Sequence, residues 1–118
     1  MQIQIRSDKN INVSDDRARE LEDIIKHALR HCSNHITRVE THLSDVNGAK
    51  RVANDKGCTM EARLENRQPL AVTDHADTVG ASVSGAAEKL ARAVKKTLER
   101  AADNRPAAPD STLPEMYD

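Results

Sequence analysis

The sequence predicts an α+β domain with the element order β-α-β-β-β-α, a four-stranded mixed sheet with two helices packed on one face. Three observations support this fold class. Short segments alternate polar and apolar residues, as half-buried strands do. Two longer segments repeat apolar residues at steps of three and four, as amphipathic helices do. The 118 residues suffice for one ordinary domain and are too few for two.

Three segments, residues 2–6, 36–46 and 58–65, predict strands because their polar and apolar residues alternate with a period of two. A fourth short strand is expected over residues 70–73, after a turn at residues 66–69. In the second segment, Val39, Thr41 and Leu43 share one face, and charged or polar residues occupy the other. A right-handed crossover through the first helix would make the first two strands parallel, and the later strands would follow as antiparallel hairpins.

The first helix is expected over residues 15–32, where apolar side chains recur at helical spacing. Ser14 precedes this run and is the natural N-cap, because its hydroxyl can accept a hydrogen bond from a free backbone N–H of the first turn. Arg30 and His31 would then lie in the last turn, where the helix dipole favours cations.

The second helix is expected over residues 78–102, with Asp77 as its N-cap and one apolar stripe along its length. Asp45–Gly48 is expected to form a turn, with Asn and Gly supplying positive φ angles. The segment 104–118 contains three of the four prolines and shows no periodicity, so we expect a disordered acidic tail after a domain of residues 1–103.

Composition narrows the classes of function. The formal net charge is −1, which excludes a polycation held to nucleic acid by bulk charge. Phe and Trp are absent and Tyr117 is the only aromatic residue, so RNA binding by base stacking is excluded too. Cys32 and Cys58 match neither a disulfide framework nor a zinc ribbon. With no apolar stretch long enough for a signal peptide or a membrane span, we expect a soluble cytoplasmic protein with reduced thiols and no cofactor.

Three separated strings carry a family resemblance. They are Arg38-Val-Glu-Thr-His-Leu-Ser-Asp-Val-Asn-Gly48, Asp55-Lys-Gly-Cys58 and Ala86-Ala-Glu-Lys-Leu-Ala-Arg92. Together they resemble the hibernation-promoting factor and ribosome-associated inhibitor A family in its short, single-domain form. The resemblance covers residues 1 to about 103, in the same order of elements.

The resemblance implies a non-enzymatic domain that binds the small ribosomal subunit and its 16S-type rRNA near the decoding region. There it would block mRNA and tRNA during stress or stationary phase. The chain has no length for the second domain with which long relatives pair ribosomes, so ribosome pairing through its own C-terminus is not expected. In isolation we expect a monomer. Many relatives carry an aromatic and an acidic residue where this chain has Gly80 and Ser84.

The resemblance also implies which residues face the RNA, namely basic residues of the two helices. In the second helix Lys89 and Arg92 match best, followed by Lys95 and Lys96. In the first helix, where the register is looser, the candidates are Lys26 and Arg30.

The residues of the last helix support an RNA contact on physical grounds as well. Lys89, Arg92, Lys96 and Arg100 follow one another at steps of three, four and four and so form one ridge. Such a ridge can follow the phosphates of folded RNA, which is recognised mainly by shape and backbone. A charged helix face is also the usual solvated face, and the dipole favours cations in the last turns whatever the function.

The sequence gives little support for a metal site or for acid–base catalysis. His27, His31 and His35 are spaced four apart and the first two could share a helical face with Cys32 nearby, but surface histidines and a buried thiol explain them more simply. The loop candidates for acid–base chemistry are Asp45, Asp55, Asp74, His75 and Asp77. No nucleophile elbow, phosphate-binding glycine loop or carboxylate pair accompanies them, so neither a metal site nor an enzyme is expected.

Two alternatives to ribosome binding by the ridge remain. The same fold could serve as a non-ribosomal protein-interaction module that uses its polar sheet face or its acidic tail. The tail could also fold back on the basic ridge and mask it. Residues 89–105 contain six basic and two acidic side chains, whereas the only charged side chains of residues 106–118 are three acidic ones.

Overall fold

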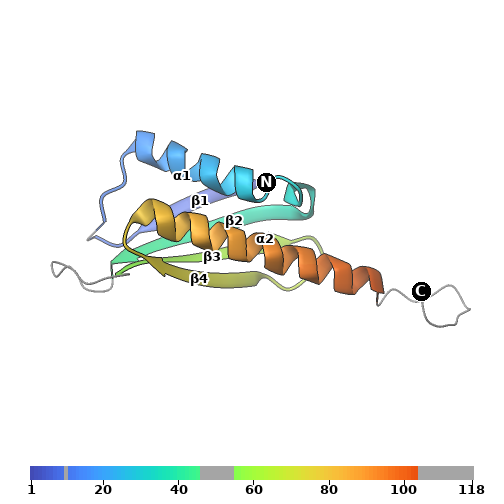
Figure 1. The fold of residues 1–118 in the computed structure, drawn as a ribbon. Coiled ribbons are helices and arrows are strands. Elements are labelled where there is room, and N and C mark those ends of the chain that lie inside the picture. Colours follow the sequence, from blue (N-terminus) through green and yellow to red (C-terminus); the bar gives the residue numbers. More distant parts are fainter. Residues whose placement is uncertain (10, 46–54, 104–118) are drawn as a thin grey trace, which may run out of the picture.

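The computed structural model describes residues 1–9, 11–45 and 55–103. Its elements are β1 (Gln2–Ser7), α1 (Asp15–Ala28), a short 3-10 helix η1 (Ser33–His35), β2 (Ile36–Asp45), β3 (Lys56–Leu64), β4 (Leu70–Ala76) and α2 (Val79–Asp103). The strands form one sheet in the order β1-β2-β3-β4, with β1 parallel to β2 and the other neighbours antiparallel. Both helices cover one face of the sheet and run in the same direction (Figure 1). The predicted architecture is confirmed.

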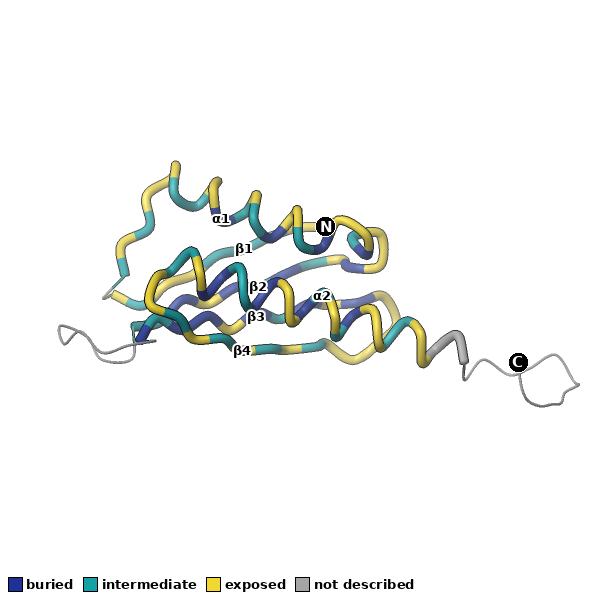
Figure 2. The backbone as a smooth tube through the Cα atoms, viewed as in Figure 1, coloured by how far each residue is buried: buried dark blue, intermediate teal, exposed yellow. Residues whose placement is uncertain are grey.

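The core lies between this sheet and the two helices (Figure 2). Its largest fully buried side chains are aliphatic, as a chain without Phe or Trp requires: Leu21, Ile25, Leu29, Leu43, Met60 and Leu90. Burying one such side chain is worth roughly 1.5–3 kcal/mol. The alternation predicted for β2 is confirmed, because Val39, Thr41 and Leu43 are buried while His42 is exposed. The Thr41 hydroxyl is buried without a hydrogen-bond partner in the described structure.

The first helix is shorter than predicted. Ser14 is its N-cap as expected, accepting from the Arg17 backbone N–H at 3.1 Å, but α1 ends at Ala28 rather than at residue 32. Arg30 and His31 therefore lie in the turns after the helix. A helix of 14 residues is ~21 Å long, which already spans the ~20 Å of a six-residue strand. The chain must then turn back to begin β2.

The fourth strand is longer than predicted, and this moves the helix cap. β4 continues to Ala76, so Asp74 and His75 lie in a strand rather than in a loop. The N-cap of α2 is Thr78, whose hydroxyl accepts from the Ala81 backbone N–H at 3.1 Å, and not Asp77. Pairing with the long strand β3 extends β4, and this tertiary pairing overrides the weak strand propensity of Asp.

Some predictions fall outside the described residues. The expected turn Asp45–Gly48 lies there except for its first residue, and so does the expected tail, residues 104–118. No helix in the described part of the chain is both long and apolar enough to cross a membrane.

A candidate nucleic-acid interface on the helical face

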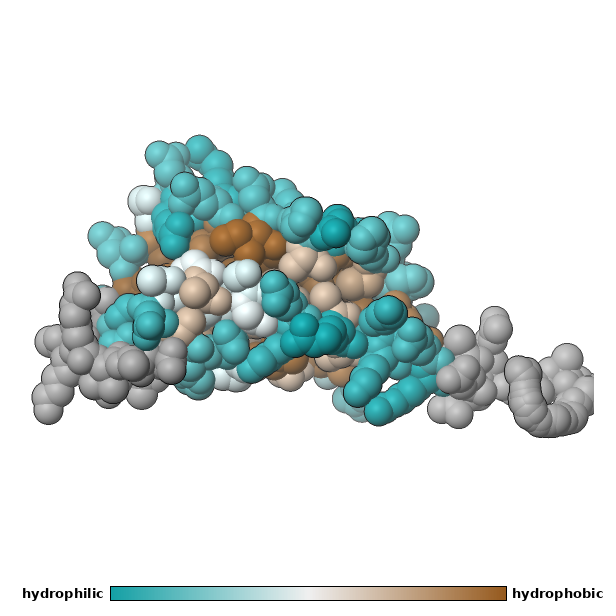
Figure 3. Space-filling view, in the orientation of Figure 1, coloured by the Kyte–Doolittle hydropathy of each residue, from teal (hydrophilic) through white to brown (hydrophobic). Residues whose placement is uncertain are grey.

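A groove of about 700 Å³ runs between α1 and α2 on the outer face of the helix layer. Ile24 and Ala28 of α1 and Ala91 of α2 line it, and Figure 3 shows hydrophobic side chains between the helices with hydrophilic ones outside them. Arg30, just after α1, and Arg92 of α2 also line this groove, together with one acidic residue from each helix. The structure thus brings together one predicted site residue from each half of the chain.

Lys89 differs from the other predicted cations because it is already bound. Its Nζ lies 2.9 Å from Asp74 Oδ1 and donates to the Thr73 carbonyl oxygen at 3.0 Å. Both partners belong to β4, so Lys89 links α2 to this edge strand of the sheet. Gly85 makes room for this contact, because a Cβ atom at that position would lie 2.0 Å from Asp74 Oδ2. From the sequence, Asp74 was a candidate only for acid–base chemistry in or beside a loop, and its ion pair with Lys89 was not predicted.

The remaining cations of α2 are exposed and unpaired within the described residues. They are Arg92, Lys95, Lys96 and Arg100. With ~100° between successive residues, Arg92 and Lys96 point outward from the sheet, while Lys95 lies on the flank toward α1. The ridge predicted from sequence is therefore present, with its first member neutralised by Asp74 and with Lys95 beside it.

The two cations predicted in the first helix, Arg30 and Lys26, lie on different sides of it. Arg30 lines the groove and donates to the His27 carbonyl oxygen at 2.6 Å. Lys26 is exposed, but it lies between Ile24 and Ala28, which both face the groove. Because a step of two residues turns a helix by ~200°, Lys26 projects from the opposite flank, away from α2.

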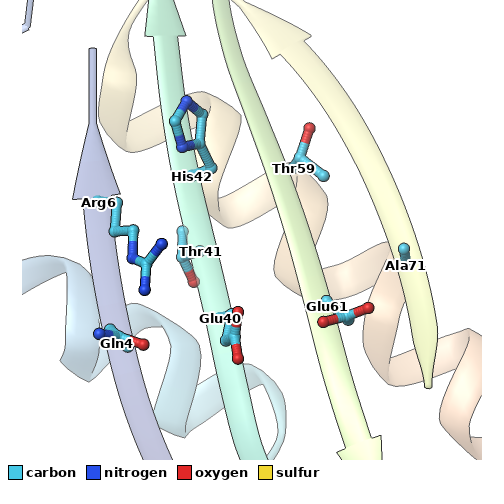
Figure 4. A pocket seen from close by; sticks show the side chains of 8 residues that line it. All are labelled: Gln4, Arg6, Glu40, Thr41, His42, Thr59, Glu61 and Ala71. Carbon is cyan, nitrogen blue, oxygen red and sulfur yellow. The ribbon is translucent and has the colours of Figure 1, made fainter. Parts of the chain in front are cut away.

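The open face of the sheet has a different electrostatic character. A shallow pocket of about 310 Å³ lies there among polar side chains of β1, β2 and β3 and beside Ala71 of β4 (Figure 4). Glu40 forms ion pairs with Arg38 at 3.2 Å and with Arg63 at 3.7 Å. Arg63 also forms an ion pair with Glu61 at 3.7 Å. The charges of this face largely neutralise one another, so it offers less to an anionic partner than α2 does.

The histidines do not assemble a metal site. His27 lies on α1, His31 in the turn after it and His35 in η1, so the shared helical face expected for the first two is wrong. No group of three or more potential ligands is found in the described parts of the chain. Both cysteines are buried free thiols, as predicted for Cys32. Burial raises the pKa of Cys32, and burial together with the nearby Asp74 charge raises the pKa of Cys58 to about 12.

The candidates for acid–base chemistry are structural. Asp45 and Asp55 both bind Lys56, with Nζ–O distances of 2.9 and 3.4 Å, and the hydrogen bond to Asp45 raises the pKa of Lys56. Asp74 holds Lys89 on the helix side of β4. His75 lies on the open face instead, beside Gly57. Because side chains alternate along a strand, Asp74 and His75 point to opposite faces and do not form a pair.

Comparison with protein families now identifies the chain's relatives. The model of the family described as sigma 54 modulation protein / S30EA ribosomal protein matches residues 3–102. The chain belongs to this family. Membership places it among ribosome-associated modulation and hibernation proteins and confirms the resemblance carried by the three strings. Comparison of the sequence with curated proteins gave no match.

Solved structures share the fold. A ribosomal subunit interface protein from Coxiella burnetii superposes with a TM-score of 0.68 at 15% identity, covering 84% of this chain and 99% of that one. The N-terminal domain of Thermus thermophilus Protein Y superposes with a TM-score of 0.64 at 16% identity, covering 82% of this chain and 99% of that one. At such low identity these likenesses establish the architecture alone.

Proposed function

We propose that this protein is a translation inhibitor that binds the small ribosomal subunit near the decoding region and keeps mRNA and tRNA out during stress or stationary phase. Family membership supports the ribosome as the partner. The unpaired cations on the outer flank of α2 support rRNA as the surface contacted. In this proposal the protein acts in the cytoplasm by occupying space, without catalysis and without a cofactor.

The observation that carries the proposal is the contrast between the two exposed faces. On the open sheet face, arginines are paired with glutamates. On α2, Arg92, Lys96 and Arg100 follow one another one turn apart with no acidic partner in the described structure. Residues one turn apart present their charges ~5–6 Å from each other. Such a row can contact successive phosphates, and phosphate contacts position a protein on RNA without reading its sequence.

The geometry ranks the predicted contact residues. Arg92, Lys95, Lys96 and Arg100 are free to bind phosphates, and Arg30 supports them from across the groove. Lys89 contributes less, since part of its charge is already neutralised by Asp74. Lys26 contributes least to this surface because it projects from the far flank of α1.

Sedimentation with purified small subunits tests the proposal. The wild-type protein should pellet with the subunits at low salt, and the pelleted fraction should fall as salt rises, because counterions displaced from RNA return. A protein that fails to pellet with small subunits at any salt concentration contradicts it. Recovery of another protein in place of ribosomes would favour the protein-interaction module.

A further inference from the structure

The free edge of β1 carries unpaired backbone groups. β1 is an edge strand, paired only with β2. The Asp8 backbone N–H donates to the Leu43 carbonyl oxygen at 3.0 Å, just beyond the partner pair Ser7 and Leu43. In a parallel ladder, alternate residues direct both backbone groups to the same neighbour. Gln4, in step with Asp8, therefore points its backbone at β2.

Ile3 and Ile5, in the alternate positions, direct their N–H and C=O groups away from the sheet. Within residues 1–9, 11–45 and 55–103 these groups have no hydrogen-bond partner. Their side chains face the helices and are only partly buried. The strand contains no Pro, no Lys and no bulge, and its one charged side chain, Arg6, lies toward its C-terminal end.

The other edge of the sheet is protected. On β4, the Thr73 carbonyl oxygen accepts a hydrogen bond from Lys89 Nζ, and α2 passes along this strand (Figure 1). A lysine against an edge strand opposes pairing with another chain. The two edges therefore differ, because among the described residues a lysine binds the backbone of β4 while no group binds the outward backbone of Ile3 and Ile5.

We propose that β1 pairs with β1 of a second copy of this chain, antiparallel about a two-fold axis at Gln4, to form a continuous eight-stranded sheet. Only the backbone N–H and C=O groups that point away from β2 can reach the second copy. With the axis at Gln4, Ile3 of each copy therefore pairs with Ile5 of the other, which gives two equivalent pairs. Each of these pairs exchanges two backbone hydrogen bonds. In this register isoleucines lie opposite isoleucines on the helix side, Gln2 lies opposite Arg6 on the open side, and no like charges face each other.

The charges on α1 fit the same axis. Its flank away from α2 carries Asp15, Arg19, Glu22 and Lys26, which alternate in sign. A helix of 14 residues and a strand of six are both ~20 Å long, and α1 runs along β1 (Figure 1), so the axis at Gln4 also passes near the middle of α1. An antiparallel second helix then places Asp15 opposite Lys26, and Arg19, which pairs with Asp16 of its own helix at 3.1 Å, opposite Glu22. This pairing gives Lys26 a role apart from the α2 surface.

Charge swapping at the axis tests the proposal and its register together. Only Gln4 lies opposite itself, on the open face, where its side chain is visible in Figure 4. Gln4 Oε1 accepts a hydrogen bond from Arg38. Gln4→Lys should therefore weaken the dimer severalfold, because it brings two lysines together beside Arg38. Gln4→Glu should weaken the dimer less, because Arg38 partly neutralises the new charge. An equimolar mixture of the two should dimerise more tightly than either variant alone. Sedimentation velocity from micromolar to millimolar protein gives the dissociation constants, and circular dichroism verifies that each variant is folded.

Three further variants complete the test. Thr59→Lys and Thr59→Glu place the same charges on the interior strand β3 of the same face, and should leave dimerisation unchanged alone and mixed. Ile5→Pro removes a donor that points only to the second copy and should abolish the dimer while leaving the β1–β2 pairing intact. A wild-type protein that stays monomeric at millimolar concentration overturns the proposal. A Gln4 mixture no tighter than its components, or a dimer that survives Ile5→Pro, overturns it as well.

Discussion

Neutralising the unpaired cations of α2 should reduce the salt dependence of ribosome binding by a calculable amount. The variant is Arg92→Gln, Lys95→Gln and Lys96→Gln, which removes three exposed charges with no acidic partner among the described residues. Each phosphate contact contributes about 0.7–0.9 to the slope of log affinity against log salt, so the slope should fall by about 2–3. Over a fourfold rise in salt, the wild type should then lose about 20–40-fold more affinity than the variant.

The assay is binding of the fluorescently labelled protein to purified small subunits over a series of salt concentrations. A matched control changes Arg6, Lys9 and Arg67 to Gln, which removes the same charge from exposed positions outside α1 and α2. The control should keep the wild-type slope. Equal slopes for all three proteins, or an equal fall in both variants, would refute the reasoning, because binding would then not depend on the α2 surface.

Other predictions concern stability. Lys89→Gln should lower the free energy of unfolding by about 0.5–1 kcal/mol by removing the partly exposed pair with Asp74, whereas Lys96→Gln should not, as thermal unfolding will show. Gly85→Ala, which would normally stabilise a helix, should cost about 1–3 kcal/mol in denaturant titration, because the new Cβ displaces Asp74; a gain in stability would contradict this contact. Thr41→Val should raise the free energy of unfolding by about 1 kcal/mol, since it removes a buried hydroxyl without a partner, and a loss would show that the hydroxyl is paired. Between pH 9 and pH 12 the Cys58 thiol of the unfolded chain loses its proton while that of the folded protein keeps it. The free energy of unfolding should therefore fall by up to about 1.4 kcal/mol per pH unit relative to that of Cys58→Ala. Parallel pH profiles of the two proteins would contradict the raised pKa.

The strand and helix periods were enough to predict the architecture, because one face of each element is buried. Val39 and Leu43 on β2 and Leu90 on α2 lie in the core as their spacing indicated. The ends of elements were less predictable. Helical periodicity continues past Ala28, but the length of the sheet ends the helix there. Strand β4 continues to Ala76 because β3 offers it partners.

The spacing of the α2 cations could be predicted from the sequence, whereas their contacts in the folded chain could not. The spacing of Arg92, Lys96 and Arg100 indicated a ridge, and the helix provides one. That Lys89 is bound to β4 depends on Asp74, which lies 15 positions earlier in the sequence and meets Lys89 only through the packing of α2 on the sheet. No local pattern reports such a contact. The sequence signal that could have revealed it is Gly85, one turn before Lys89, where an ordinary helix would carry a side chain.

Competition on the small subunit tests the central claim most directly. Small subunits are loaded with labelled mRNA and initiator tRNA, and the release of both is measured as the protein is added. The proposed function predicts that wild-type protein displaces both ligands and that the Arg92, Lys95 and Lys96 triple variant displaces them only at much higher concentration. Simultaneous binding of the wild-type protein, mRNA and tRNA to the same subunit would contradict it.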